Sequence, residues 1–396
     1  MRILHVSAQK PEGTGSGVYL TETVRGFAQL GAEQVVVAGI MPDDSPVLPE
    51  GVRFFPVIFD TDELPFPVCG MSDNMPYRAT RYRDLTPQMV AQFRAAFDRV
   101  IDDVLDVFEP DLVICHHLYL LTAHLAQRTW PCPVAGISHN TDLRQFTSIP
   151  LEREAIASGV NRLDCIYALH GAQAREIVRV FGVDEEKVHV VGTGFNELEF
   201  RRLDGVSKKP HSLVYVGKIW RQKGVPNLLR AIDLLPEAYD DVHLDLIGGY
   251  SDKQDYDDIV EQSRSCKRSL AFQGKVDQDD LVCAYNHSEV FVLPSLSEGL
   301  PLVVIEALAC GCKVVVTDLP GIREWISSSL EDAPVFYVDP PAMVEGGGAD
   351  PSDAGRFERE LAAALCEALD APEPDCEVTH LSWKGVCTRM LDCIAG

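Results

Sequence analysis

Two glutamates that lie eight positions apart are the residues of this chain best suited to bind or transform a ligand. Glu298 follows an apolar run, 290–293, and Glu306 lies inside a second apolar run, 302–309. The first run predicts a buried strand and Pro301 begins a helical pattern, so the turn between them should present helix-start N–H groups to an anionic ligand. Because a carboxylate among apolar residues needs a partner, we expect both glutamates to face one site. An ordinary strand–helix unit with two solvated glutamates is the alternative.

Two lysines supply positive charge after another predicted strand, 212–216. Lys218 directly follows Gly217, and Lys223 precedes a helical pattern. Cations at a strand end beside a helix start form a phosphate site by charge and geometry, although a lysine lacks the bidentate geometry of an arginine. The alternative is a loop with two solvated lysines.

Three histidines in the N-terminal half lie at or just past predicted strand ends. His116 and His117 end one apolar run, and His139 follows another. A single histidine in such a place is more often structural. Since functional residues of a parallel sheet gather at the carboxyl ends of its strands, imidazoles at two such ends indicate a site. Arg144, shortly after His139, is a candidate for binding an anionic group of donor or acceptor.

A glycine-rich loop follows the first predicted strand, 2–6. It contains Gly13, Gly15 and Gly17 and precedes a helix that we expect from about residue 18 to 30. The Gly-x-Gly-x-Gly spacing lacks the third glycine of a dinucleotide fingerprint at its usual offset, and no acidic residue ends the next strand. We therefore do not expect an NAD site.

The segment 41–90 is rich in proline and has no regular pattern, so we expect it to be irregular. A loop of this length in a compact domain is functional or disordered, and its aromatic and methionine content argues against disorder. It carries the densest basic cluster of the N-terminal half, which includes Arg78. Acceptor binding and a structural lid that packs on its own domain are the two alternatives.

Size and composition limit the classes of protein. The 396 residues suffice for two or three domains, and 46% hydrophobic with 24% charged residues is typical of a soluble globular chain. The net charge of −25 leaves no basic lobe for nucleic acid. No apolar stretch reaches the ~18 residues of a membrane span. The first residues predict a strand and not a cationic segment followed by an apolar one, so we expect no signal peptide. We expect a cytoplasmic protein, with contact to the inner face of the membrane left open.

The 12 cysteines are scattered, several of them inside apolar runs, and no Cys-x-x-Cys occurs. This usage indicates reduced, buried thiols, and it argues against a disulfide framework or a zinc site.

Strand and helix patterns alternate in both halves of the chain. This alternation predicts an α/β protein with two Rossmann-like, doubly wound parallel-sheet domains. We expect an N-terminal domain over 1–205 and a C-terminal domain over 206–375. A terminal helix within 376–396 should return to the N-terminal domain. The polar stretch 200–210 has the composition of a linker. The oligomeric state stays open.

Three of these motifs together resemble the retaining glycosyltransferases of family 4, which have the GT-B fold. The segment from Glu298 to Glu306 resembles their Glu-x7-Glu signature. His139-Asn-Thr-Asp142 is similar to a His-Gly-Thr-Asp variant, with asparagine where glycine is common. The lysine segment from Gly217 to Gly224 resembles a Gly-Arg…Lys-Gly element, with Lys218 at the arginine position. The likeness spans essentially the whole chain and is weakest in 41–90.

The resemblance implies two domains that face each other across a cleft. It also implies transfer of a sugar from a nucleotide-sugar donor to a sugar, glycan or lipid-linked acceptor, with retention of configuration, in cell-envelope, polysaccharide or glycoconjugate synthesis. It implies catalytic roles for His139, Lys218, Lys223 and Glu298. The implied donor-binding residues are Gly15, Gly17, Gly217, Lys218, Lys223, Gly274, Lys275, Val276, Glu298, Gly299, Leu300, Pro301 and Glu306. On the acceptor side we name His116, His117, Arg144 and Arg78.

Within this resemblance Glu306 would take the ribose hydroxyls and Glu298 the hydroxyls of the donor sugar. The lysines and the amides of Gly299 and Leu300 would hold the diphosphate, and His139 would meet the donor sugar or its phosphate. Fixed cations and amides address the leaving phosphate directly, so we expect neither a metal nor a cofactor. The leaving phosphate would assist front-face attack, with no covalent enzyme intermediate.

Other readings of the same residues remain. The two carboxylates could serve a hydrolase as acid and base. The fold could belong to a GT-B-like isomerase or phosphorylase, or to a catalytically silent protein that binds sugar nucleotides.

Overall fold

The computed structural model describes residues 1–11, 13–73, 75–298, 301–330, 332–344, 348–373 and 376–395. They form two compact units. Unit 1 comprises Met1–Gly194 and Trp383–Gly396, and unit 2 comprises Phe195–Ser382. From the sequence we expected boundaries at 205/206 and 375/376. The structure instead places residues 195–205, and the residues before the last helix, 376–382, in unit 2.

Unit 1 is built on a seven-stranded sheet with the order β3-β2-β1-β6-β7-β8-β9. Every neighbouring pair is parallel. The strands are β1 (Arg2–Ser7), β2 (Glu33–Ile40), β3 (Arg53–Ile58), β6 (Leu112–His116), β7 (Val134–Ile137), β8 (Cys165–Ala168) and β9 (Val188–Val190). The central strands are almost continuously buried, as expected for parallel strands covered on both faces.

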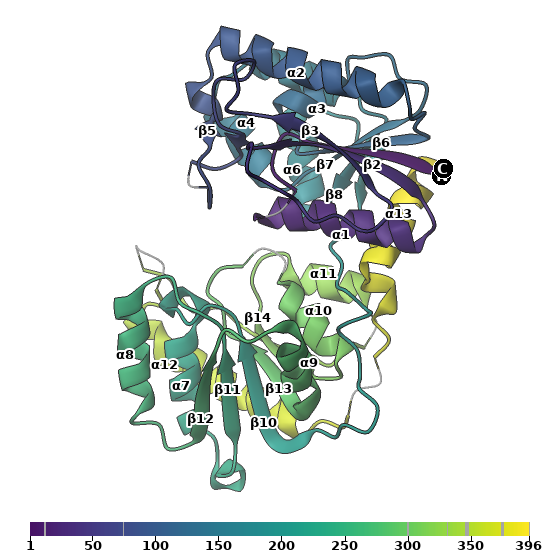
Figure 1. Cartoon of the computed structure of the whole chain (residues 1–396). Helices are drawn as coiled ribbons and strands as arrows, with labels where there is room; N and C mark the ends of the chain where they lie inside the picture. The colour runs from purple at the N-terminus through teal and green to yellow at the C-terminus, as the bar shows by residue number, and fades with distance from the viewer. Residues whose placement is uncertain are drawn as a thin grey trace. The chain divides into compact units, whose positions relative to one another are not determined.

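Helices cover both faces of this sheet (Figure 1). α2 (Pro87–Leu105) packs on one face, where its core cluster includes Leu4 of β1. α1 (Gly15–Gln29) and α13 (Trp383–Ala395) pack on the other face, together with the neighbouring Ile3. Successive β1 side chains thus enter opposite clusters, as the pleat of a strand requires. The other helices of the unit are α3 (Leu120–Leu125), α4 (Thr141–Ser148), α5 (Arg153–Val160) and α6 (Gly171–Phe181).

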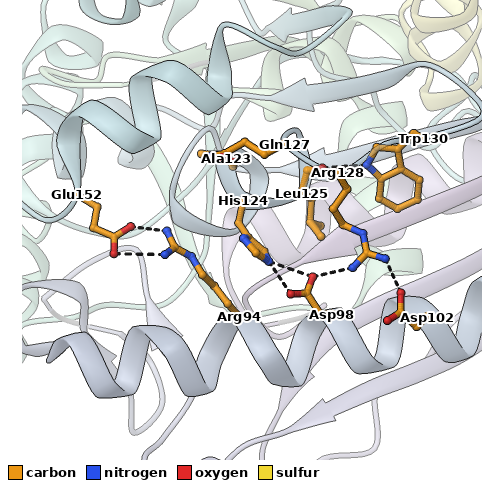
Figure 2. Close-up of polar contacts among 10 residues, drawn as sticks. All are labelled: Arg94, Asp98, Asp102, Ala123, His124, Leu125, Gln127, Arg128, Trp130 and Glu152. Carbon is orange, nitrogen blue, oxygen red and sulfur yellow. Dashed lines mark hydrogen bonds and ion pairs between the residues drawn. The ribbon is translucent and has the colours of Figure 1, made fainter.

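Charged side chains hold α2 to the segments that pack beside it (Figure 2). Asp98 accepts from Nε2 of His124 at 2.9 Å and from Arg128 at 2.8 Å. Arg94, one turn earlier on α2, pairs with Glu152 before α5. Residues four apart on a helix share one face, so a single polar face of α2 ties together α3 and the start of α5.

α13 is bound closely to unit 1. The Tyr167 hydroxyl donates to the Met390 carbonyl at 2.8 Å, and the Cys387 thiol donates to the Thr23 carbonyl at 3.3 Å. A Cβ atom at Gly26 would lie 2.6 Å from the Trp383 carbonyl oxygen, so α1 and α13 touch through this glycine. The terminal helix thus packs on the N-terminal unit, and it begins at Trp383, where we expected a start near residue 377.

Unit 2 contains a six-stranded parallel sheet with the order β12-β11-β10-β13-β14-β15. Its strands are β10 (Lys209–Val216), β11 (His243–Ile247), β12 (Ser269–Gly274), β13 (Ser288–Leu293), β14 (Lys313–Thr317) and β15 (Val335–Val338). Its helices are α7 (Val225–Asp233), α8 (Lys253–Ser263), α9 (Gln278–His287), α10 (Leu302–Ala309), α11 (Ile322–Ser329) and α12 (Pro351–Asp370). The order reverses between β10 and β13, the switch point beside which ligands bind in such sheets. The prediction of two doubly wound parallel-sheet units is confirmed.

The segment 41–90 is more regular than we expected. β3 lies within it and pairs with β2 over six residues, from Arg53 to Ile58. Two further residue pairs form the small sheet of β4 (Cys69–Gly70) and β5 (Thr80–Arg81). The expectation of an irregular segment was wrong for these residues, because Pro56 inside the strand RFFPVI obscured its pattern. Pro56 is tolerated because β3 is the edge strand of the sheet.

Candidate active site

Four consecutive loops of unit 2 are joined at the carboxyl edge of its sheet. Gly217 donates its backbone N–H to the Ile247 carbonyl at 2.9 Å, and Gly248 donates to the Gly274 carbonyl at 2.7 Å. Leu296 donates to the Gln222 carbonyl at 3.0 Å. The loops after β10, β11, β12 and β13 therefore form one continuous backbone surface, and those sequence-predicted residues of unit 2 that the structure describes lie on it or beside it.

Two glycines make this close packing of loops feasible. Gly224 has φ of 69°, and a Cβ atom there would lie 1.9 Å from the Pro294 carbonyl oxygen. Gly248 has φ of 142°, and its Cβ atom would lie 1.9 Å from the Gly217 carbonyl oxygen. Side chains at these positions would push the lysine loop away from its neighbours.

Lys223 and Glu298, which are 75 residues apart in sequence, form a direct ion pair. The Lys223 Nζ to Glu298 Oε1 distance is 2.6 Å, and the Ser295 hydroxyl donates to the same oxygen at 2.7 Å. The side chains are only 22% and 14% exposed. The cation and carboxylate that we placed in one site from the sequence thus contact each other, and Ser295 is a participant that the sequence analysis missed.

The other cations of this edge are more open. Lys218 and Lys275 are exposed, and within the described ranges no carboxylate pairs with either. Gly274 ends β12 in a left-handed conformation, with φ of 69°. Val276 lines a cavity of about 690 Å³ that extends along the sheet to His243 at the start of β11. Two positive charges are therefore available to an anion at this edge.

Glu306 lies in the second turn of α10, a helix that follows its N-cap residue Pro301. The carboxyl is half-buried, and among the described residues no side chain forms a hydrogen bond or ion pair with it. Burial, followed by the negative charge of Glu199, raises the pKa of Glu306 to about 7. A carboxyl with no partner among the described residues is suited to a ligand that donates hydrogen bonds. Gly299 and Leu300 lie outside the described residues.

In unit 1, His139 stands in a group of aromatic rings. The His116 ring is nearly parallel to it, at 10° with centroids 5.5 Å apart, and the centroid of the His117 ring lies 4.7 Å away. The ring of Tyr19 meets it edge-on at 5.1 Å. Burial lowers the pKa of His139 and of His117 to about 3, and it also lowers that of His116. The three histidines named from the sequence therefore form one neutral cluster, which Tyr19, not predicted from sequence, helps to enclose.

A buried carboxylate that the sequence analysis did not assign to the site joins the two histidine loops. Asp142, 0% exposed, accepts from the backbone N–H of Leu118 at 2.8 Å and from that of His139 at 3.2 Å. It also accepts from the Ser138 hydroxyl at 3.0 Å. Its place three residues after His139, at the start of a helix, is the signal that could have identified it as a loop-capping residue.

The remaining predicted residues of unit 1 lie in varied surroundings. Asn140 has φ of 65°, which explains why a glycine is common at this position. Arg144 is exposed on α4. Arg78 is 71% exposed and pairs with Asp60 at 3.1 Å. Gly15 and Gly17 belong to the first turn of α1 and not, as we expected, to the loop before it. The Thr14 hydroxyl accepts from the Gly17 N–H and starts the helix earlier.

Three Asp-x-Asp triplets occur, at 60–62, 255–257 and 277–279. The first aspartate of each triplet has a structural partner. Asp60 pairs with Arg78, Asp255 binds Arg221 at 2.8 Å, and Asp277 accepts from the Asp280 N–H. Within the described ranges, no group of three His, Cys, Asp or Glu side chains is placed to hold a metal ion. Among the same residues, no helix is long and apolar enough to cross a bilayer.

Two family models match the chain. The one described as Glycosyltransferase Family 4 matches residues 13–197, and the one described as Glycosyl transferases group 1 matches residues 210–346. They correspond closely to the two compact units, so the family resemblance that we inferred from the motifs is confirmed.

Relatives and solved structures agree with this assignment. An uncharacterized glycosyltransferase of Methanocaldococcus jannaschii is 29% identical over 183 residues, which cover 43% of this chain and 46% of the relative. A D-inositol 3-phosphate glycosyltransferase of Xylanimonas cellulosilytica is 24% identical, and the match covers 100% of this chain and 95% of that relative. Anabaena HepE in complex with UDP shares the fold with a TM-score of 0.59, 13% identity and 100% coverage of both chains. The chain thus belongs to the glycosyltransferases of family 4 and has the GT-B fold.

Proposed function

We propose that this protein transfers a sugar from a nucleoside diphosphate sugar to an acceptor hydroxyl, with retention of the anomeric configuration. The observation that carries the proposal is the Lys223–Glu298 pair on the same sheet edge as Glu306, Lys218 and Lys275. A nucleoside diphosphate sugar presents what these groups complement, namely a dianionic diphosphate between two sets of hydroxyls.

The different parts of the donor would bind different groups of the site, according to charge. The diphosphate would bind Lys223 and Lys218, together with N–H groups at the start of α10. As the bond to the sugar breaks, negative charge grows on the leaving phosphate, and fixed cations stabilise that charge without reorganisation. We propose that Glu306 accepts from the ribose hydroxyls and that Glu298 accepts from hydroxyls of the donor sugar.

The Lys223–Glu298 pair gives donor binding a definite first step. Without a donor, each charge neutralises the other in a half-buried place. An arriving phosphate offers Lys223 a second anion, and the donor sugar offers Glu298 hydroxyl donors. Both charges keep hydrogen-bond partners during the exchange, so the site avoids the cost of an unpaired buried charge.

The proposal also states where the acceptor proton goes and whether a metal is needed. The leaving phosphate oxygen would take the acceptor proton on the face where the sugar departs, so no enzyme carboxylate would form a covalent intermediate. We also propose that transfer needs neither a divalent metal nor a cofactor. His139 would contact the donor sugar or its phosphate. Arg144 and Arg78 remain acceptor-side predictions, whereas His116 and His117, each only 2% exposed, are too enclosed to meet an acceptor directly.

A thermal-shift panel of UDP, GDP, ADP and their sugar conjugates tests donor binding. UDP comes first because HepE, a protein of the same fold, was solved with UDP and with UDP-glucose. A ligand that binds only the folded protein at 100 times its Kd stabilises it by about 2.7 kcal/mol. A flat panel would contradict donor binding. Binding without consumption of any nucleotide sugar would identify a silent binding protein.

The stereochemistry is tested separately. Proton NMR of the first product formed gives its anomeric configuration, and the same assay in excess EDTA tests metal dependence. Inversion of the anomeric centre, or loss of rate that added Mg²⁺ restores, would each refute the corresponding part of the proposal.

A further inference from the structure

His116 and His139 of unit 1 share a hydrogen bond. Nδ1 of His116 lies 3.3 Å from Nε2 of His139. Both rings are neutral, because burial lowers both pKa values far below 7. A neutral imidazole has one N–H donor and one acceptor nitrogen. One of the two rings must therefore donate, and the direction of donation fixes the tautomer of the other.

The surroundings of His116 decide the direction. Its second nitrogen, Nε2, is enclosed and has no hydrogen-bond partner among the described residues. If His139 donated, the proton of His116 would have to lie on this enclosed Nε2, as a buried N–H group without an acceptor. If His116 donates from Nδ1, its Nε2 carries only a lone pair. Orphaned buried N–H groups are rarer than unsatisfied buried acceptors, so donation from His116 is favoured.

We propose that His116 is a positioning residue, which donates from Nδ1 to Nε2 of His139 and holds His139 in the tautomer with its proton on Nδ1. His139 Nδ1 forms no hydrogen bond within the described ranges and is not among their enclosed, unpartnered atoms. His139 thus offers a ligand an N–H donor and no basic lone pair. It binds a ligand oxygen and does not act as a general base.

The loops around the pair keep the two rings in register. Asp142 holds the backbone at His139 and, through Leu118, the loop that follows His116. The Tyr19 hydroxyl donates to the Gly192 carbonyl at 2.9 Å, which fixes the ring that closes the cluster beside His139. The tautomer is therefore a property of a rigid site, which exists before any ligand arrives.

This inference rests on the proposed function only for the identity of the ligand oxygen, which would belong to the donor sugar or its phosphate. Long-range ¹H–¹⁵N NMR of the ligand-free, full-length protein tests it without any activity. We expect His139 to show a protonated Nδ1 and a pyridine-like Nε2. A protonated Nε2 on His139 would overturn the proposal, whether or not the protein proves to be a transferase.

Two variants and a control separate positioning from packing. In His116→Asn the amide nitrogen can take the place of Nδ1 and donate, so the His139 tautomer should persist and kcat should stay within a few-fold. In His116→Leu the donor is lost, and kcat should fall about 10- to 100-fold, by analogy with the loss of a side chain that orients a metal-bound histidine. His124→Asn, outside the cluster, should change neither the tautomer nor kcat.

The outcome that contradicts the variant series is a His116→Leu protein with the parent tautomer and the parent kcat. If His116→Leu fails to fold, the parent spectrum and His116→Asn still decide the question. Loss of the Nδ1 tautomer in His116→Asn with full activity would likewise overturn the assigned role.

Discussion

Replacement of Glu306 by glutamine should stabilise the protein at high pH and weaken donor binding at the same time. Burial and Glu199 raise the pKa of Glu306 from 4.5 to about 7. At pH 8 the carboxyl is ionised in both the folded and the unfolded chain, and its charge is poorly solvated in the folded one. Near pH 4 it is protonated and this penalty disappears. The penalty therefore grows as pH rises from 4.5 to 7 and is complete above 7.

The size of the effect follows from the shift. Each pKa unit corresponds to about 1.4 kcal/mol, so the ionised carboxyl of Glu306 costs the folded state up to about 3 kcal/mol at pH 8. At pH 5 the cost is below about 1 kcal/mol by the same linkage. For a unit of this size, 1 kcal/mol moves Tm by about 2–4 °C. Glu306→Gln should raise the Tm at pH 8 by up to about 6–12 °C.

The assay is thermal unfolding followed by circular dichroism at pH 5 and pH 8, for the parent protein and Glu306→Gln. Glu367→Gln, on an exposed face of α12, is the control and should leave Tm unchanged at both values. The donor that stabilises the parent protein should lose most of its effect on Glu306→Gln. An unchanged or lower Tm of Glu306→Gln at pH 8 would refute the argument from burial. A full donor effect on the variant would refute the ribose role alone.

Three further predictions use matched changes. Lys223→Ala should destabilise unit 2 and abolish donor binding, because Glu298 then stays half-buried without its cation. In urea unfolding, the double variant Lys223→Ala with Glu298→Ala should lose less free energy of unfolding than Lys223→Ala alone. Gly224→Ala should destabilise by well over the ~1 kcal/mol of left-handed strain, because its Cβ atom would strike a carbonyl. Gly182→Ala, with a similar φ of 66° but open space, should cost only that strain, and equal urea midpoints for the two would contradict the steric argument. Asp98→Asn should lower the free energy of unfolding by about 1–3 kcal/mol, measured by the same urea unfolding, because Asp98 binds both His124 and Arg128. A loss below about 0.5 kcal/mol would show that the charged contacts of Figure 2 do not hold α2 in place.

The sequence was most informative where one local pattern sufficed. Continuous apolar runs such as 290–293 predicted buried parallel strands, because a strand covered on both faces has no polar side. The spacing of Glu298 and Glu306 indicated a ligand site without any coordinates. The edge strand β3 was missed, because Pro56 interrupts a pattern that only pairing with β2 makes regular.

The contacts of the site could not be predicted in the same way. The sequence placed Lys223 and Glu298 on separate strand–helix turns, and only the order of β10 beside β13 brings the two loops into contact. Asp142 looked like one polar residue of a helix start, yet it joins loops that follow two different strands.

What the sequence alone determined is therefore the alternation of strands and helices, the family and the residue types gathered at strand ends. Those features depend on local periodicity and on short motifs. The tertiary structure decided which charges meet, which carboxyl has no hydrogen-bond or ion-pair partner among the described residues, and that the rings of His116 and His139 lie within hydrogen-bond distance. Each of these depends on burial and on distances of a few ångströms between residues far apart in the chain, which no local pattern contains.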